Sequence, residues 1–596
     1  MAKETQKSTV KGSAFEWRLI RRILSYTGAY RLQFALALLF TILGALLAPV
    51  VPYLFQYVLD NPTVRGDVSG VRFWILVILG VLVLRSVIMY VQTMLTGWLG
   101  QSVIRDIRIQ VYRHITRMRA KYFDQNPVGM LQTRTISDVE VLNDVFSNGL
   151  VSIMGELLTL VTIFTIMMVV SWKLTLVILI TLPLLLGATI VFKNTIKAAF
   201  QGVRKYVSEM NSFLQEHITG MLVIQIFNRE KVEYDRFDDI NGKHRDANLK
   251  SVLAYSIFFP TVEIITALAT ALLVWYGVGR VLDGVITFGA LVAFLMYINM
   301  FFRPIRMLAD RFNTLQLGMV SAERIFKVLD TEDRIEDTGT RTEIQGQDGP
   351  LNIAFRKVWF AYNEQDWVLK DISFDVKAGK KVALVGSTGA GKTTIINLLS
   401  RLYEINRGRI CINDVDITEL KLEKLRSLIG LVLQDVFLFS GSIYDNITLN
   451  NPNIPREQVQ KAAAYVGADR FISQLPGGYD YNVQERGATL SAGQRQLIAF
   501  ARVLVYDPSI LILDEATSSI DTESEELIQH AIEKVMAGRT SIIIAHRLST
   551  IQKADQILVM DKGEIMERGN HQELLEQDGI YKRLYLLQFA ERQFAK

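Results

Sequence analysis

Residues 386–394 read GSTGAGKTT and follow the apolar stretch KVALV at residues 381–385. The glycines let backbone N–H groups converge on a phosphate, and the apolar run that follows predicts a helix whose N-terminus also favours an anion. A strand, a glycine-rich turn and a helix in this order are typical of a phosphate-binding P-loop. The stretch therefore predicts an α/β P-loop fold for the part of the chain that contains it.

The residues of this loop indicate an ATP site with a magnesium ion. Lys392 is expected to contact the terminal phosphates, and Thr393 is expected to donate its hydroxyl oxygen to Mg²⁺. The predicted cofactors are therefore ATP and Mg²⁺. The residues expected to surround the phosphates are Gly386, Ser387, Thr388, Gly389, Ala390, Gly391, Lys392, Thr393 and Thr394.

A second apolar strand, ILIL at residues 510–513, ends in the acidic pair Asp514 and Glu515. Asp514 is the carboxylate expected on Mg²⁺, through water, and Glu515 is placed to polarise the attacking water as general base. An acidic pair can instead cap a helix, but that alternative does not explain the apolar strand in front of it. The pair predicts that the chain is an ATP hydrolase.

The first half of the chain has the hydropathy of a membrane protein. Hydrophobic residues make up 50% of the 596 residues, the mean hydropathy is +0.23, and the excess lies before Pro304. Six apolar runs, each close to the about 20 residues that cross a bilayer, lie at 33–59, 73–99, 150–170, 174–192, 256–276 and 286–304. These runs predict an all-α six-helix transmembrane domain followed by an α/β P-loop ATPase domain. The expected divisions are an amphipathic lead-in at 1–32, the transmembrane domain at 33–325, a linker at 326–350 and the nucleotide-binding ATPase domain at 351–596.

Positive charge marks the two long links between the spans. The links between spans two and three and between spans four and five carry, among others, Arg105, Arg108, Arg113, Lys193, Lys197 and Arg204. The positive-inside rule places these links in the cytoplasm, together with the N-terminus and the ATPase domain. The prediction is a multi-pass protein of the cytoplasmic (inner) membrane. Residues 15–31 are basic and amphipathic, so they lie along the membrane surface or form a solvated helix.

Composition excludes several other classes of protein. The single cysteine, Cys411, excludes an intramolecular disulfide and a multi-cysteine metal site, and the six histidines show no HExxH spacing. The net charge of +5 does not imply nucleic acid as a partner. The apolar spans make a lipid bilayer the expected partner.

Residues 490–494 read LSAGQ and lie between the P-loop and the acidic pair. With this motif the chain resembles the ATP-binding cassette (ABC) transporters, and its whole length resembles the type IV exporters, in which one membrane domain precedes one ATPase domain. The resemblance implies that Ser491, Gly493 and Gln494 bind the γ-phosphate held by the opposite ATPase domain, so that two domains enclose two ATP. The family form is LSGGQ, and Ala492 departs from it.

The resemblance also implies roles for residues outside these motifs. Tyr362 matches the aromatic residue that stacks on adenine, and the alternative is a strand tyrosine in a small core. Gln434 matches the loop glutamine that contacts Mg²⁺, and Asp521 matches the loop that crosses the dimer interface. His546 matches the switch histidine that touches the γ-phosphate. Catalytic roles are thus expected for Glu515, His546 and Gln434, and Mg²⁺ ligation for Thr393, Gln434 and Asp514.

The expected function is ATP-driven export of an amphipathic substrate, drug-like or lipid, by alternating access in a dimer. The tips of the two long links, at 123–138 and 220–236, resemble the coupling helices of exporters. An alternative is an ATP-gated channel or regulatory ABC membrane protein, against which the intact Glu515 and His546 argue. Glu515 together with the altered Ala492 favours a heterodimer with a second half-transporter, although glycine to alanine is a mild change that a homodimer can tolerate.

Three ionisable residues lie inside the predicted spans, namely Arg85, Glu156 and Glu263. Charge at membrane depth is costly, so each should face a cavity or a partner. One interpretation is that the glutamates line a substrate cavity and favour cationic or amphipathic cargo. The other, which is favoured, is that Arg85 pairs with a glutamate between helices.

Overall fold

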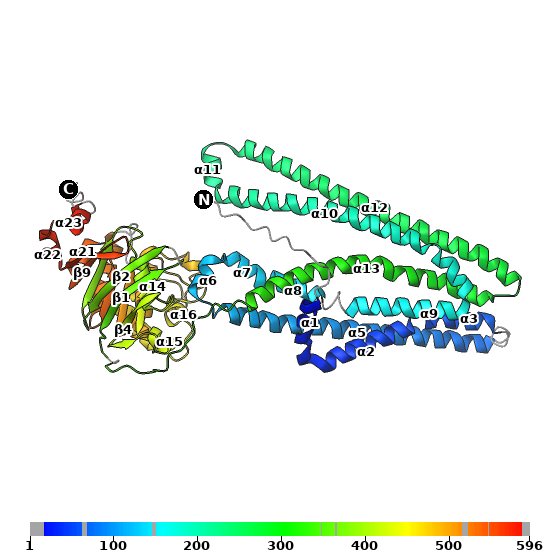
Figure 1. Cartoon of the computed structure of the whole chain (residues 1–596), viewed down its shortest axis with the longest axis horizontal. Coiled ribbons are helices and arrows are strands. Elements are labelled where there is room, and N and C mark those ends of the chain that lie inside the picture. Colours follow the sequence, from blue (N-terminus) through cyan, green and yellow to red (C-terminus); the bar gives the residue numbers. More distant parts are fainter. Residues whose placement is uncertain are drawn as a thin grey trace. The chain divides into compact units, whose positions relative to one another are not determined.

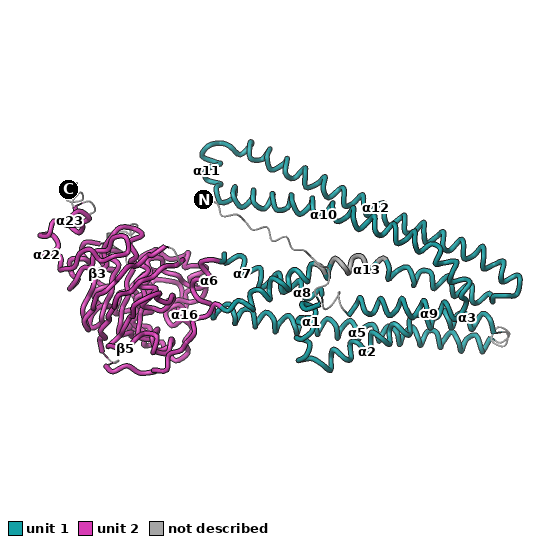
Figure 2. Tube along the Cα trace, in the orientation of Figure 1, with its two compact units in different colours: residues 1–117, 126–332 teal, residues 118–125, 333–596 magenta. Residues whose placement is uncertain are grey.

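The computed structural model describes residues 17–61, 68–145, 151–346, 349–363, 366–514, 522–545 and 547–586. The chain forms two compact units, which Figure 2 shows in different colours. Unit 1 comprises Met1–Arg117 and Asn126–Glu332, and unit 2 comprises Met118–Gln125 and Asp333–Lys596. Unit 2 therefore contains eight residues of the link between spans two and three as well as the C-terminal half of the chain.

Unit 1 is helical throughout its described residues, as Figure 1 shows. Among them, six helical stretches are long and apolar enough to cross a membrane, as the sequence predicts. The helices are α1 (Trp17–Ser25), η1 (Tyr26–Tyr30), α2 (Arg31–Leu47), α3 (Val50–Asp60), α5 (Val68–Ile115), α7 (Val128–Thr135), α8 (Ser137–Asp144), α9 (Val151–Leu179), α10 (Leu182–Thr219), α11 (Met221–Ile226), α12 (Glu230–Leu282) and α13 (Phe288–Leu329).

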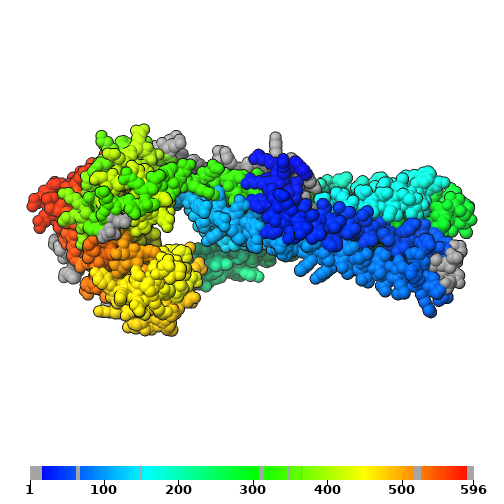
Figure 3. Space-filling view, turned by 90° about the horizontal axis from the view of Figure 1, so that it is seen from below, coloured from blue at the N-terminus to red at the C-terminus, as the bar shows by residue number. Residues whose placement is uncertain are grey.

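Several of these helices are longer than a bilayer requires. Helix α5 has 48 residues and α12 has 53, against the about 20 that span the hydrocarbon core. The spans therefore continue as helices beyond the membrane. Helices α10 and α12 pack against each other and are joined by the short helix α11, which makes a long hairpin (Figure 1). In Figure 3 the N-terminal helices, in dark blue, lie on the outside of unit 1 beside α5.

The predicted boundary between spans three and four is wrong. Residues 171–173 were expected to link the spans, but α9 continues to Leu179 and the chain turns at Ile180 and Thr181 before α10 begins. The polar interruption instead produces a kink, because Ser171 has non-helical angles (φ −162°, ψ 101°) inside α9. The apolar residues after Lys173 extend the helix by nearly two further turns, to Leu179, and α10 then begins at Leu182 with Pro183 in its first turn.

The tips of the long links are short helices, but the first begins earlier than predicted. Helix α6 (Ala120–Gln125) starts three residues before the predicted tip at 123–138, and α7 starts after Pro127. Proline fixes its own φ and lacks an N–H, so it suits the start of a helix and not its interior. The second tip, predicted within 220–236, contains α11.

Unit 2 contains two sheets. The smaller is antiparallel with strand order β2-β1-β4-β5, and the larger has the order β10-β9-β3-β8-β7-β6. The strands are β1 (Ile353–Ala361), β2 (Trp367–Val376), β3 (Lys381–Gly386), β4 (Arg407–Ile412), β5 (Val415–Asp416), β6 (Ile429–Val432), β7 (Ile510–Asp514), β8 (Thr540–Ile544), β9 (Gln556–Asp561) and β10 (Glu564–Gly569). The helices are α14 (Lys392–Leu399), α15 (Leu422–Ser427), α16 (Ile443–Thr448), α17 (Arg456–Tyr465), α18 (Asp469–Ile472), η3 (Gly478–Asp480), η4 (Glu485–Gly487), α19 (Ala492–Tyr506), α20 (Thr522–Met536), α21 (Leu548–Gln552), α22 (His571–Glu576) and α23 (Ile580–Tyr585).

The larger sheet separates two hydrophobic cores. Along β3, Ala383 and Val385 join one core, and Val382 and Leu384 join the other. This alternation follows from the two-residue period of a strand, and a strand buried on both faces reads as a continuous apolar run. Strands β3, β8, β7 and β6 are parallel, so their carboxyl ends meet at one edge of the sheet. The P-loop and the residues after β6, β7 and β8 are therefore brought to the same edge.

Candidate functional site

The P-loop lies between β3 and α14, as predicted, and its lysine is already directed into the loop. The Lys392 ammonium group donates to the carbonyl oxygens of Gly386 at 2.7 Å and Ser387 at 2.9 Å. Only 8% of Lys392 is exposed, and burial lowers the pKa of its ammonium group, although the carboxylate of Asp514 acts in the opposite sense. A buried cation that donates to carbonyl oxygens among the described residues is well suited to receive the negative charge of a phosphate.

Three glycines of the loop adopt positive φ angles that other residues disfavour. Gly386 has φ +158°, Gly389 has φ +84° and Gly391 has φ +102°. A Cβ atom at Gly386 would lie 2.2 Å from the carbonyl oxygen of Met560, and one at Gly391 would lie 2.6 Å from a methyl group of Leu369. The loop therefore needs glycine at both positions because neighbouring strands approach it closely.

The sheet edge also holds two of the predicted magnesium ligands. Asp514 is the last residue of β7 and is half-buried, and Gln434 follows β6 and is exposed. Thr393, in the first turn of α14, is exposed as well. Carboxylate, amide and hydroxyl oxygens are the ligands that Mg²⁺ prefers. These residues fit a magnesium site next to the phosphates.

Tyr362 follows β1 and is half-buried, beside the P-loop helix. Its hydroxyl forms a hydrogen bond with Thr394 Oγ1 at 3.2 Å, and its ring packs edge-on against Phe360 and Tyr403. The residue that was predicted to stack on adenine is thus fixed on one side by an aromatic cluster.

The LSAGQ motif forms the N-terminus of α19. Ser491 Oγ accepts a hydrogen bond from the N–H of Gln494 at 3.2 Å, and Gln494 Oε1 accepts one from the N–H of Ser491 at 3.0 Å. This reciprocal pair is a capping box, which the S-x-x-Q spacing specifies. Gly493 is buried and Ser491 is exposed. The N–H groups of the first helical turn make this end of α19 suitable for an anion.

Three predicted site residues, Glu515, Asp521 and His546, lie outside the described residues. Their positions in the chain still follow from their neighbours. Glu515 comes directly after Asp514 at the end of β7, and His546 comes two residues after β8 ends at Ile544.

Sequence reasoning missed two residues that lie close to the candidate nucleotide site. Tyr403 donates a hydrogen bond to the carboxylate of Asp124, which belongs to α6. Burial, with a smaller contribution from Asp124, raises the pKa of the Tyr403 phenol. The only sequence signal was the RLYE stretch after the P-loop helix, which carries no spacing that points to a residue so distant in the chain.

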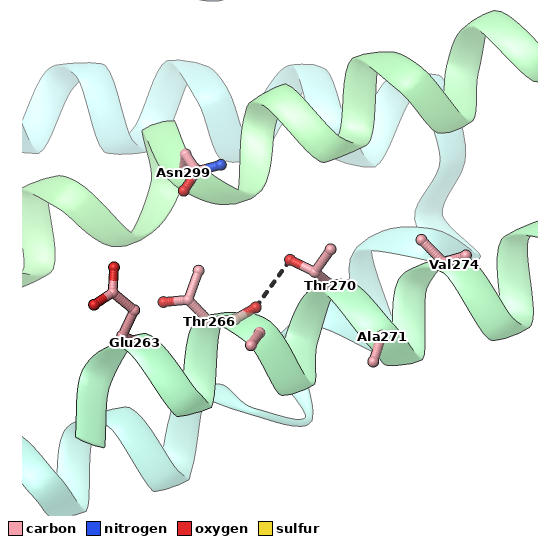
Figure 4. A pocket seen from close by; sticks show the side chains of 7 residues that line it. Glu263, Thr266, Thr270, Ala271, Val274 and Asn299 are labelled. Atoms are coloured by element: carbon pink, nitrogen blue, oxygen red, sulfur yellow. Dashed lines mark hydrogen bonds between the residues drawn. The ribbon is translucent and has the colours of Figure 1, made fainter. Parts of the chain in front are cut away.

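The ionisable residues that the sequence places inside the spans line two hollows of unit 1. A cavity of about 460 Å³ lies between α2, α5, α9 and α13, and Arg85, Glu156 and Arg303 line it. A second hollow, of about 590 Å³, lies between α12 and α13 and is lined by Glu263 and Asn299 (Figure 4). The structure describes Arg85, Glu156 and Glu263, and Arg85 forms no ion pair with either glutamate, so the favoured pairing of Arg85 with a glutamate is wrong. Arg85 and Glu156 face a shared cavity instead.

Comparison with known proteins agrees with this division. A family model of the ABC transporter transmembrane region matches residues 34–305, and one described as ABC transporter matches residues 369–518. The chain is 40% identical over 578 residues to an uncharacterized ABC transporter ATP-binding protein, YknV, of Bacillus subtilis, covering 97% of this chain and 95% of the relative.

Two further relatives carry names that describe a function. A probable multidrug resistance ABC transporter ATP-binding/permease protein, YheH, of Bacillus subtilis is 38% identical over 89% of this chain and 78% of its own length. An ATP-dependent lipid A-core flippase of Thiobacillus denitrificans is 35% identical over 96% of this chain and 99% of its own length. The chain belongs to the ABC transporters, as a multi-pass half-transporter of the exporter type in which one membrane region is fused to one ATP-binding domain.

Proposed function

We propose that this chain is one half of a dimeric exporter that hydrolyses ATP to move an amphipathic compound, drug-like or lipid, across the cytoplasmic membrane. The observation that carries the proposal is the P-loop itself. Its buried Lys392 lies at the edge of the larger sheet that also holds Asp514 and Gln434. The same chain has six candidate membrane spans among its described residues.

The residues at this sheet edge would have separate roles in ATP hydrolysis. Lys392 and the loop N–H groups would bind the phosphates of ATP, and Thr393, Asp514 and Gln434 would hold Mg²⁺, which supplies charge neutralisation when bound. Glu515 would accept a proton from the attacking water, and His546 would contact the γ-phosphate from the neighbouring strand end. Tyr362 would stack on adenine.

A second chain is needed to complete the site. In the proposed dimer, the α19 N-terminus, with Ser491, Gly493 and Gln494, binds the γ-phosphate held by the partner's P-loop, and Asp521 lies at the same interface. The tip of the α10–α12 hairpin supports this proposal, because α11 has no buried residue and exposes Leu222, Ile226 and Phe227. Exposed apolar groups at the end of a hairpin indicate a protein contact that forms on assembly. The combination of an intact Glu515 with the altered residue Ala492 in the LSAGQ motif favours a heterodimer.

The proposed substrate is amphipathic because the cavity between α2, α5, α9 and α13 is lined by both kinds of group. Arg85 and Glu156 carry charge, whereas Met89, Ile163 and Met300 are apolar. Methionine side chains adapt to ligands of different shape, which suits a transporter of varied compounds. The positive charge of the long links supports an orientation with the N-terminus and the ATPase domain in the cytoplasm.

The test of this proposal is transport in inside-out vesicles from cells that produce the chain together with any partner chain. A fluorescent amphipathic dye is added outside, and its uptake is followed after Mg·ATP is supplied. We expect uptake with the wild-type chain and none with Glu515→Gln, which keeps the size of the side chain but removes the base. Equal uptake by the two vesicle preparations would contradict export driven by this ATPase.

A further inference from the structure

The eight residues of the first long link that belong to unit 2 are held there by several contacts. Met118 forms a β-bridge with Arg334, and the guanidinium Nε of Arg119 donates to the carbonyl oxygen of Arg334 at 2.7 Å. The N–H of Arg119 donates to the carbonyl oxygen of Asp333 at 3.0 Å, and Ala120 packs against the core that contains Val382 and Leu384 of β3. Helix α6 is therefore built into the unit that contains the P-loop.

One side chain near the candidate nucleotide site reaches this segment. Tyr403, which is 9% exposed, follows the P-loop helix and donates its hydroxyl proton to Asp124 of α6. The edge of its ring faces the Tyr362 ring, with centroids 5.0 Å apart and planes at 89°. Edge-to-face aromatic pairs are directional, so a movement of one ring displaces the other.

Tyr362 in turn is tied to the P-loop helix. Its hydroxyl pairs with Thr394 Oγ1 at 3.2 Å and accepts a hydrogen bond from the amide of Asn397 at 3.5 Å. The side chain of Tyr403 therefore connects α6 with Tyr362, the residue proposed to stack on adenine. The phosphates, in contrast, would be bound by Lys392 and the N–H groups of the loop, whereas the Tyr403 ring packs against Phe360 and Tyr362 on the proposed adenine side.

We propose that Tyr403 is a positioning residue that couples occupation of the adenine side of the nucleotide site to helix α6. The inference rests on the proposed function, because it takes Tyr362 as the adenine platform. When a base stacks on Tyr362, the ring of Tyr403 is fixed, and its hydroxyl holds Asp124 more firmly. The coupling therefore depends on the base, and a ligand with phosphates alone does not produce it.

Hydrogen–deuterium exchange of the full chain in lipid nanodiscs tests this coupling. The exchange of residues 118–125 and of 386–394 is compared without ligand, with Mg²⁺ and the non-hydrolysable analogue AMP-PNP, and with Mg²⁺ and inorganic tripolyphosphate. We expect AMP-PNP to slow exchange in α6 about five-fold or more, at the lower end of allosteric couplings between sites. Tripolyphosphate should protect residues 386–394 and leave α6 unchanged.

The variant Tyr403→Phe keeps the ring and removes the hydroxyl, so it should bind AMP-PNP at 386–394 and lose the response of α6. The variant Asp124→Ala should behave in the same way. A matched control is Tyr479→Phe, because Tyr479 is also buried and donates to an aspartate, Asp469, at 2.7 Å, within the other core of unit 2. It should respond to AMP-PNP as the wild type does.

Three results would overturn the proposal. Tyr403→Phe could retain the response of α6 to AMP-PNP, or tripolyphosphate could produce the same response in the wild type. The wild-type α6 could also fail to respond while residues 386–394 are protected. Each of these three results would refute the coupling through Tyr403 and would leave the proposed ATPase function intact. If AMP-PNP leaves 386–394 unprotected in the wild type, the proposed nucleotide site fails, and the coupling fails with it.

Discussion

Replacing Ser491 by alanine separates the structural role of this residue from its proposed role at the γ-phosphate. In the folded chain Ser491 Oγ accepts one hydrogen bond from the N–H of Gln494, and the reciprocal bond from the Ser491 N–H to Gln494 Oε1 would survive in alanine. The loss of an N-cap serine costs about 1 kcal/mol. A change of this size lowers the melting temperature of a domain of 150–250 residues by about 2–4 °C.

The chain contains a matched control for this substitution. Ser442 forms the same capping box at the start of α16, where its Oγ accepts from the N–H of Asp445 at 2.9 Å and donates to the Asp445 carboxylate at 2.6 Å. Ser442→Ala loses both bonds, so it should be at least as destabilising as Ser491→Ala. Thermal unfolding of the two variants in nanodiscs should show comparable shifts.

ATP turnover should distinguish the two variants. A hydrogen bond to a charged group contributes about 1.5–3 kcal/mol, which corresponds to about a 10- to 150-fold loss of turnover. Ser491→Ala should lose activity in this range, whereas Ser442→Ala should keep activity near that of the wild type at a temperature below its unfolding. Equal losses in the two variants would refute the reasoning, because they would show that Ser491 acts only as a helix cap.

Three further predictions concern the P-loop, the adenine platform and the N-terminal helices. Gly386→Ala should destabilise the chain and abolish ATP binding, measured by binding of a fluorescent ATP analogue. Gly389→Ala should have a milder effect because no atom lies within 4 Å of its Cβ position. Equal effects of the two substitutions would contradict the close approach of Met560 to Gly386. Tyr362→Ala should weaken ATP binding about 5- to 100-fold, the range for loss of base stacking, and Tyr362→Phe should change it little. Arg22 donates to Asp330 at 2.7 Å and holds the pKa of that carboxyl below its usual range. The ion pair therefore stabilises the chain above the ordinary carboxyl pKa and is lost as the pH falls through the lower folded value. Arg22→Ala should therefore lower the melting temperature more at pH 7 than at pH values below the folded pKa, where the variant still lacks the contact of Arg22 with the Phe326 ring.

The features that the sequence predicted correctly are determined by residues that lie close together in the chain. The P-loop follows from a strand, glycines and a helix in one run of residues, and the capping box at Ser491 is visible as the spacing to Gln494. The six spans follow from the length of their apolar runs. In each case local residues specify the structure, and distant contacts only refine it.

The features that were missed depend on tertiary contacts or on small energetic differences. Tyr403 and Asp124 are 279 residues apart, and no local pattern relates them. Trp172 and Lys173 interrupt the apolar run and so predict a link between two spans, whereas the structure has a kink at Ser171 because the residues that follow are apolar enough to continue the helix. The pairing expected between Arg85 and a glutamate assumed that charges in a span must neutralise each other, whereas Arg85 and Glu156 both face a cavity.

The most direct test of the central claim is ATP turnover by this chain alone, purified in lipid nanodiscs and measured beside Glu515→Gln. The account predicts hydrolysis that requires Mg²⁺ and is lost in the variant, either with this chain alone or, if a heterodimer is required, after a second half-transporter is added. Hydrolysis that survives in Glu515→Gln would contradict the assignment of Glu515 as the base. A well-folded chain that binds no ATP, with or without a partner chain, would contradict the account as a whole.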